Sequence, residues 1–193
     1  MIFKRKIYDE LLRWKRTDEG RTAVLIQGAR RVGKSTVAEE FATNEYDTHI
    51  LVDFAACSSE IRDLFNDVSD LNRIFMRLQL EYGIELKERK SAIIFDEVQL
   101  APKARQAIKY LVKDGRYDYI ETGSLISIRK NVKDILIPSE EVKLHMYPMD
   151  YEEFKWALGD TATINLLQGC FHNRTSLGDA TNRKLMREFR LYM

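Results

Sequence analysis

One short segment, residues 28–36, constrains the possible fold of this chain more than any other feature. It reads Gly-Ala-Arg-Arg-Val-Gly-Lys-Ser-Thr, so four residues separate two glycines, and a lysine and a serine follow the second glycine. An apolar run at residues 22–27 precedes the segment, and Val37, Ala38 and Phe41 begin an amphipathic stretch after it. A strand that turns through glycines into a helix is typical of a phosphate-binding loop.

Each residue type in this loop has a physical reason to be there. Glycines let the backbone turn tightly and bring its N–H groups against phosphates, which also lie at the positive end of the following helix. Lys34 would reach the β- and γ-phosphates, the Ser35 hydroxyl would coordinate Mg²⁺, and Thr36 would support the helix start. We therefore predict that a nucleotide is bound by Gly28, Ala29, Arg30, Arg31, Val32, Gly33, Lys34, Ser35 and Thr36. The sequence does not decide the role of Arg30 and Arg31. Each could contact the nucleotide, contact a neighbouring subunit, or be a solvated residue of the loop.

Three further apolar runs, at residues 49–54, 91–95 and 117–121, have the composition of buried strands. Stretches with helical periodicity separate them. The clearest helical patterns are Phe3, Ile7, Leu11 and Trp14, which predict a helix ending near residue 17, and Leu100, Ala104, Ile108 and Leu111. Strands that alternate with helices form parallel crossover units. The predicted fold class is α/β, a parallel sheet flanked by helices.

Two carboxylates, Asp96 and Glu97, directly follow the run at residues 91–95. Asp96 is predicted to hold Mg²⁺ together with Ser35, and Glu97 to polarise the water that attacks the γ-phosphate. An acidic pair at a strand end is common by itself. Its combination with the phosphate-binding loop indicates ATP hydrolysis, in which Lys34 and Glu97 are catalytic.

Hydroxyl residues follow the run at residues 117–121. Thr122 or Ser124 could hydrogen-bond the γ-phosphate or the attacking water, so both join the predicted catalytic residues, although Thr-Gly-Ser is also ordinary turn chemistry. Asp53, at the end of another predicted strand, either faces the site or is solvated.

In this order, these segments resemble the sensor-bearing P-loop ATPases of the AAA-like and STAND groups. The resemblance is most specific to a prokaryotic family of AAA-type ATPases. Its members share a GxRxVGK[ST]T loop, a strand ending in DExQ, a [ST]GS turn and a YPxxxEEF stretch. Here these motifs are residues 28–36, 96–99, 122–124 and 147–154. The resemblance implies a five-stranded parallel core in which the strand before Thr122 lies between the strands before Gly28 and Asp96, and ATP with Mg²⁺ as ligands.

The resemblance also implies a domain organisation. Residues 1–160 would form the ATPase domain with its N-terminal helix, and residues 161–193 would begin a C-terminal helical segment, apparently truncated. Hydrolysis would then switch an appended domain or a protein partner. A final helix is predicted from Leu185, Met186, Phe189 and Tyr192, whose apolar face has no obvious partner in the chain.

Self-assembly is the least supported part of the resemblance. Many relatives carry an arginine between the sensor turn and the Tyr-Pro stretch, whereas residues 137–141 here are Ile-Pro-Ser-Glu-Glu. Arg129 or Lys130 are the alternative candidates for an arginine finger. An oligomer is therefore possible without a residue that identifies it.

Composition limits the remaining partners. The 193 residues, 45% of them hydrophobic, suffice for one substantial core. Their 31 Lys and Arg against 30 Asp and Glu leave a net charge of +1, so a nucleic acid would need a local basic patch. Cys57 and Cys170 lack the spacing of a zinc site or a disulfide framework. The charged N-terminal stretch excludes a signal peptide or membrane span there, and we expect a cytoplasmic protein.

Two alternatives to an ATPase stay open. A nucleotide-gated binding module would hold ATP with little hydrolysis. A small-molecule or nucleotide kinase would share the loop but needs an arginine-rich lid, and no such segment stands out. The chain also has no Asn-Lys-x-Asp motif for reading guanine, which favours ATP over GTP.

Overall fold

The computed structural model describes residues 3–124 and 139–193. The chain divides into two compact units, one formed by Ile7–Tyr147 and the other by Met1–Lys6 with Pro148–Met193. The predicted domain boundary after residue 160 stays a prediction.

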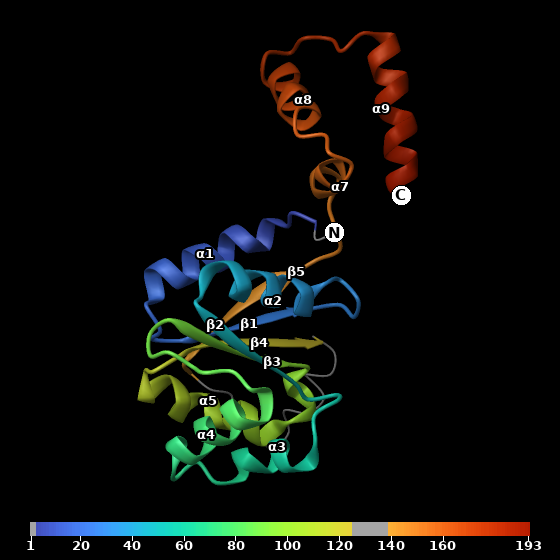
Figure 1. Cartoon of the computed structure of the whole chain (residues 1–193). Helices are drawn as coiled ribbons and strands as arrows, with labels where there is room; N and C mark the ends of the chain where they lie inside the picture. The colour runs from blue at the N-terminus through green and yellow to red at the C-terminus, as the bar shows by residue number, and fades with distance from the viewer. Residues whose placement is uncertain (1–2, 125–138) are drawn as a thin grey trace. The chain divides into compact units, whose positions relative to one another are not determined.

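A five-stranded parallel sheet organises the larger unit (Figure 1). Its strands are β1 (Ala23–Gly28), β2 (Thr48–Asp53), β3 (Ser91–Asp96), β4 (Asp118–Ser124) and β5 (Glu141–Met146). Their order is β2-β3-β4-β1-β5, and the four recorded pairings are all parallel. The predicted α/β class is therefore confirmed, as is the position of β4 between β1 and β3. Strand β4 extends beyond its predicted end and includes Thr122 and Ser124.

Helices cover both faces of this sheet (Figure 1). They are α1 (Lys6–Asp18), α2 (Lys34–Glu45), α3 (Ser59–Asp63), α4 (Leu71–Tyr82) and α5 (Pro102–Asp114), with short 3₁₀ turns η1 (Leu64–Asn66) and η2 (Val98–Leu100). Helices α1 and α2 pack on one face, and α3, α4 and α5 on the other. Strands covered on both sides must be apolar throughout, which explains the unbroken apolar run of β1 and β3.

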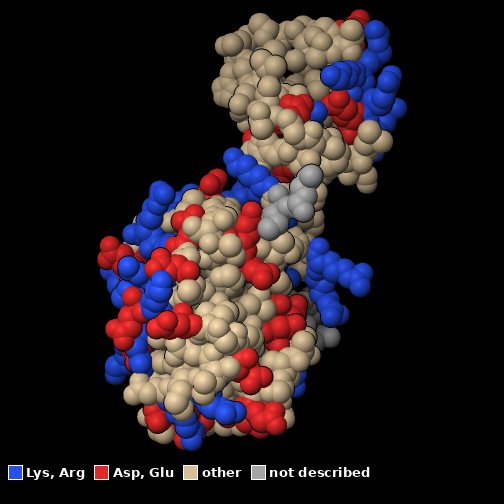
Figure 2. Space-filling view, viewed as in Figure 1, with Lys and Arg blue, Asp and Glu red and all other residues tan. Residues whose placement is uncertain are grey.

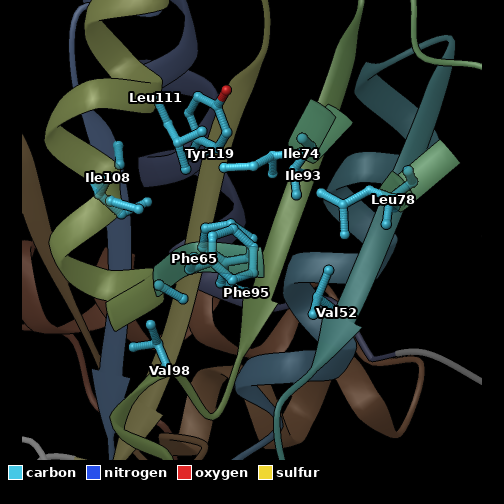
Figure 3. Close-up of a cluster of buried hydrophobic side chains, with 14 of the residues drawn as sticks. Val52, Phe65, Ile74, Leu78, Ile93, Phe95, Val98, Ile108, Leu111 and Tyr119 are labelled. Atoms are coloured by element: carbon cyan, nitrogen blue, oxygen red, sulfur yellow. The ribbon is translucent and has the colours of Figure 1, made fainter. Parts of the chain in front are cut away.

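The larger part of the core lies between the sheet and α4 and α5 (Figure 3). Phe95 of β3 is its centre. The Phe95 ring lies edge-on to Phe65, with ring centroids 5.2 Å apart, and 6.3 Å from the ring of Tyr119. Val98, the second residue after β3, is fully buried in the same cluster, so the core also fixes the turn that follows the strand.

Two residues predicted to lie on buried helical faces are exposed. Phe3 lies before the start of α1 and is 41% exposed, whereas Ile7, Leu11 and Trp14 are buried as predicted. Leu100 is 50% exposed because it belongs to η2 rather than to α5. Pro102 explains this break, since proline is favoured in the first turn of a helix and α5 begins there.

The smaller unit contains helices α7 (Tyr151–Ala157), α8 (Thr163–His172) and α9 (Asp179–Tyr192). Helix α7 begins with a capping box, in which the Asp150 carboxylate accepts from the Glu153 N–H and the Glu153 carboxylate accepts from the Asp150 N–H. Glu153 is buried and also forms an ion pair with Arg5 at 3.1 Å. The motif Glu-Glu-Phe therefore has a structural role at the start of this helix.

The prediction that the final helix has no partner in the chain is wrong. Its aromatic residues pack against α7, with the ring of Tyr151 5.2 Å from Phe189 and 5.7 Å from Tyr192. The Tyr192 hydroxyl also donates to the Met149 carbonyl at 2.9 Å. Met186, which belongs to the predicted apolar face, and Leu191 remain exposed. Within the described ranges, no helix is both long and apolar enough to cross a membrane.

Candidate nucleotide-binding site

The predicted phosphate-binding loop connects β1 to α2 at the carboxyl edge of the sheet. Gly28 is the last residue of β1, and Lys34 is the first of α2. Two residues between them, Arg31 and Gly33, have left-handed backbone with φ of 64° and 93°. The loop therefore makes the tight turn for which glycine is suited at position 33. Because parallel strands end at the same edge, Asp96 and Ser124 lie at this edge as well.

The first glycine of the loop is required by packing rather than by its own dihedral angles. Gly28 pairs with Met146 of β5, and a Cβ atom built on Gly28 would lie 2.1 Å from the Met146 carbonyl oxygen. A side chain there would force β1 and β5 apart. The close approach of β5 thus fixes where the loop leaves the sheet.

Lys34 lies against its own loop. Its side chain is buried, and its ammonium donates to the Ala29 carbonyl at 2.8 Å. Burial lowers the pKa of Lys34, and the negative charges of Glu97 and then Asp96 oppose that effect. Both carboxylates therefore act on the lysine from within the same site.

Asp96 joins the loop to the sheet. Its Oδ1 atom accepts a hydrogen bond from the Ser35 hydroxyl at 2.6 Å and another from the Thr122 hydroxyl. The Thr122 oxygen also accepts from the backbone N–H of Glu97 at 3.2 Å. One threonine of β4 thus contacts both Asp96, the last residue of β3, and Glu97, the residue after it.

The Ser35 and Asp96 oxygens fit the predicted Mg²⁺. Magnesium prefers hard oxygen donors, and it takes only one or two from the protein when substrate phosphates and water supply the rest. A hydroxyl and a carboxylate already in contact at 2.6 Å can be reached by one ion. The two residues that would hold the metal are therefore adjacent.

Glu97 has an unusual backbone conformation and a side-chain partner. Its φ of 53° and ψ of 43° place it in the left-handed region, which costs a residue other than glycine about 1–2 kcal/mol. The carboxylate accepts a hydrogen bond from the Gln99 side-chain amide. Gln99 was not assigned a role from the sequence, although it is the last residue of the DExQ motif that could have indicated one.

The other predicted site residues are less closely connected. Ser124 is buried and pairs in register with Gly28, next to the loop. Asp53 pairs with Asp96, but its carboxylate accepts from the Ala55 N–H at 2.8 Å and so stabilises the local turn. Arg30 and Arg31 are exposed on the loop. The finger candidates at positions 129 and 130 lie outside the described residues.

A family model described as an AAA domain matches residues 20–155, which is more than half of the chain. The chain belongs to the AAA family. This match includes β1 to β5 and reaches into α7, so the site just described belongs to an AAA-type P-loop ATPase domain, as predicted. None of the curated proteins matches the chain.

Several solved structures are distantly similar to this AAA domain. One is PCH-2 of C. elegans, at 10% identity and a TM-score of 0.44, covering 84% of this chain and 46% of that one. The RuvB Holliday junction branch migration motor of Thermotoga maritima has 13% identity and a TM-score of 0.47, with 81% and 51% covered. The Pif1 helicase from Candida albicans has 12% identity and a TM-score of 0.45, with 97% and 48% covered. The chain thus spans about half the length of each.

Proposed function

We propose that this AAA domain hydrolyses ATP with Mg²⁺ and thereby switches an appended domain or a protein partner. The observation that carries the proposal is the chain of contacts from Ser35 through Asp96 and Thr122 to the backbone of Glu97. These contacts connect the loop that would bind the phosphates to the residue that would activate water. A domain that only held ATP would need the phosphate-binding loop but no residue to activate water.

In the proposed reaction, different residues bind the phosphates, hold the metal ion and activate water. The loop N–H groups and Lys34 bind and orient the phosphates, and Ser35 with Asp96 would hold Mg²⁺. The metal ion supplies charge neutralisation for the phosphates when bound. Glu97 orients the attacking water and accepts its proton, while Thr122 or Ser124 contacts the γ-phosphate side of the site.

The smaller unit supports the second half of the proposal, the switching of a partner. Helix α8 has no buried residue, and Leu166 and Phe171 are 67% and 83% exposed. We take these two exposed apolar side chains as candidate contacts for another domain or protein. Figure 2 shows basic side chains gathered along α9, whereas charges of both signs alternate over the larger unit. The exposed basic residues of α9 are Arg183, Lys184, Arg187 and Arg190.

Two variants test the hydrolysis itself. Phosphate release from Mg²⁺-ATP and ATP binding would be measured for the wild type, Lys34→Ala and Glu97→Gln. We expect Lys34→Ala to weaken binding because it removes the buried ammonium from the loop. Glu97→Gln should keep ATP bound while lowering turnover by about 10²- to 10⁴-fold, the usual contribution of a general base. Exposed matched controls are Lys109→Ala on α5 and Glu81→Gln on α4, both expected to behave as wild type.

The same assay decides between the alternatives. ATP binding without turnover, with candidate partners also present, would favour the nucleotide-gated binding module. Transfer of the phosphate to a nucleoside or nucleotide would favour a kinase. No binding at all would mean that the loop at residues 28–36 does not hold a nucleotide, and the proposal would be wrong. We place this activity in the cytoplasm.

A further inference from the structure

We infer that Gln99 is a positioning residue for ATP hydrolysis, whose side-chain amide holds the Glu97 carboxylate in place beside the phosphate-binding loop. The inference rests on the proposed function, because it concerns the residue proposed to activate water. Gln99 was given no role in the proposed function, so the inference adds one residue to those that support hydrolysis.

The contact between the two side chains is the first observation. The Gln99 Nε2 atom donates to Oε2 of Glu97, although only one residue separates them in the sequence. Gln99 is 7% exposed, so its amide is largely withdrawn from water. A buried amide that donates to a carboxylate forms a charge-assisted hydrogen bond, which is stronger than one between neutral groups.

The backbone between the two residues makes this contact specific. The left-handed conformation of Glu97 turns the chain directly into η2, where the Leu100 N–H donates to the Glu97 carbonyl at 2.9 Å. The Ala101 N–H donates to the Val98 carbonyl at 3.0 Å, and Val98 itself is fully buried in the core. Gln99 is therefore attached to a fixed turn rather than to a loose loop.

The left-handed backbone of Glu97 brings its carboxylate within reach of the Gln99 amide, which limits the movement of the carboxylate. A glutamate side chain has three rotatable bonds, so a carboxylate at a strand end would sample many positions unless something held it. The Thr122 hydroxyl holds the Glu97 backbone N–H, and the Gln99 amide holds its carboxylate. Misplacing a catalytic group by 1 Å can lower a rate by about a hundredfold, so two-point fixation matters for turnover.

The kinetic test uses Gln99→Met, which keeps the length of the side chain and removes the amide. We expect kcat for Mg²⁺-ATP hydrolysis to fall about tenfold or more while the Kd for ATP stays within about twofold. Gln99→Asn, whose amide is one methylene too short, should behave in the same way and serves if the methionine variant fails to fold. The matched control is Gln106→Met on α5, which should retain the wild-type kcat.

A purely structural role for Gln99 predicts a different result in a double-mutant cycle. If Gln99 acts through Glu97, then Gln99→Met causes no further loss once Glu97→Ala has been introduced. Equal losses in both backgrounds would overturn the inference, as would a loss of ATP binding that parallels the loss of kcat.

A measurement without turnover tests the contact directly. The side-chain amide signals of Gln99 in a ¹⁵N–¹H spectrum can be identified by their disappearance in Gln99→Met. They should shift in Glu97→Ala and stay in place in Glu81→Ala; unmoved signals in Glu97→Ala would contradict the inference. A wild type that hydrolyses ATP, with full kcat in Gln99→Met, contradicts this inference alone. A wild type that binds ATP without turnover contradicts the proposed function and this inference together.

Discussion

The two glycines of the phosphate-binding loop serve different physical purposes. Gly33 has a φ of 93°, which an L-amino acid with a side chain rarely adopts. Gly28 has no such dihedral angle, and its restriction comes from the Met146 carbonyl oxygen of the neighbouring strand. One position therefore depends on local backbone energy and the other on the packing of β1 against β5.

This difference predicts the effect of Gly28→Ala. The added methyl group must displace the β5 backbone, so we expect a loss of about 1–3 kcal/mol in the free energy of unfolding, the usual range for overpacking. Urea denaturation measures it, and ATP binding should weaken in the same variant. Gly169→Ala is the control, since nothing lies within 4 Å of its Cβ position on α8. Equal stability of Gly28→Ala and wild type would show that β5 does not approach as closely as described.

At the scale of elements, β4, α5 and β5 enclose a group of charges away from the loop. Arg105 of α5 forms a buried ion pair with Glu141 of β5 at 3.1 Å. Glu121 of β4 is fully buried beside them, and Lys143 also acts on it. Burial raises the pKa of Glu121 well above its ordinary value, and the charge of Glu141 raises it further. Glu121 is thus protonated in the fold over a pH range in which it is ionised in the unfolded chain.

The sign of the pH dependence follows from that difference. Above the ordinary carboxyl pKa of 4.5, the folded state binds a proton at Glu121 that the unfolded state has lost, so this residue makes stability fall as pH rises. The slope from one such group is at most about 1.4 kcal/mol per pH unit. Glu121→Gln removes it, and urea denaturation at several pH values should give a flatter profile and higher stability at neutral pH. The exposed control Glu81→Gln should keep the wild-type slope; a Glu121→Gln profile with that same slope would contradict the prediction.

The sequence predicts those features that depend on residues close together in the chain, and it does not predict contacts between distant residues. Strands β1 to β4 were predicted because parallel strands covered on both faces are continuous apolar runs, and the loop because its glycines and lysine have fixed spacing. Strand β5 was not predicted from such a run, because it lies at the edge of the sheet and its residues are mostly half-buried or exposed. The capping box of α7 was missed, although Asp150 and Glu153 have the required spacing. The contacts of Thr122 with Asp96, and of α9 with α7, could not be predicted, because they join residues far apart in the chain.

At the scale of the whole molecule, the predicted nucleotide site belongs entirely to one unit. The loop and the Asp96, Glu97 and Thr122 positions all lie within Ile7–Tyr147. The unit formed by Met1–Lys6 and Pro148–Met193 has its own aromatic cluster, built from Tyr151, Phe154 and the end of α9. The proposed ATP binding and the proposed switching of a partner are thus assigned to different units.

Removing residues 148–193 tests this separation. A unit with its own hydrophobic core can in principle fold alone, so we expect a chain ending at residue 147 to bind ATP within about threefold of the wild-type Kd. Isothermal titration with ATP and Mg²⁺ measures it, and Lys34→Ala in the shortened chain serves as the control for specific binding. Loss of binding in a shortened chain that is still folded by circular dichroism would show that the smaller unit contributes to the site.

The strand order has a further consequence on the ribosome. Strand β1 ends at Gly28, whereas its two hydrogen-bonded neighbours begin at Asp118 and Glu141. At about 5 to 20 residues per second, synthesis leaves β1 without a neighbour for roughly 5 to 20 seconds. Throughout that time its apolar residues and both of its hydrogen-bonding edges are open to other chains. A nascent chain that stalls before β4 therefore exposes an aggregation-prone strand.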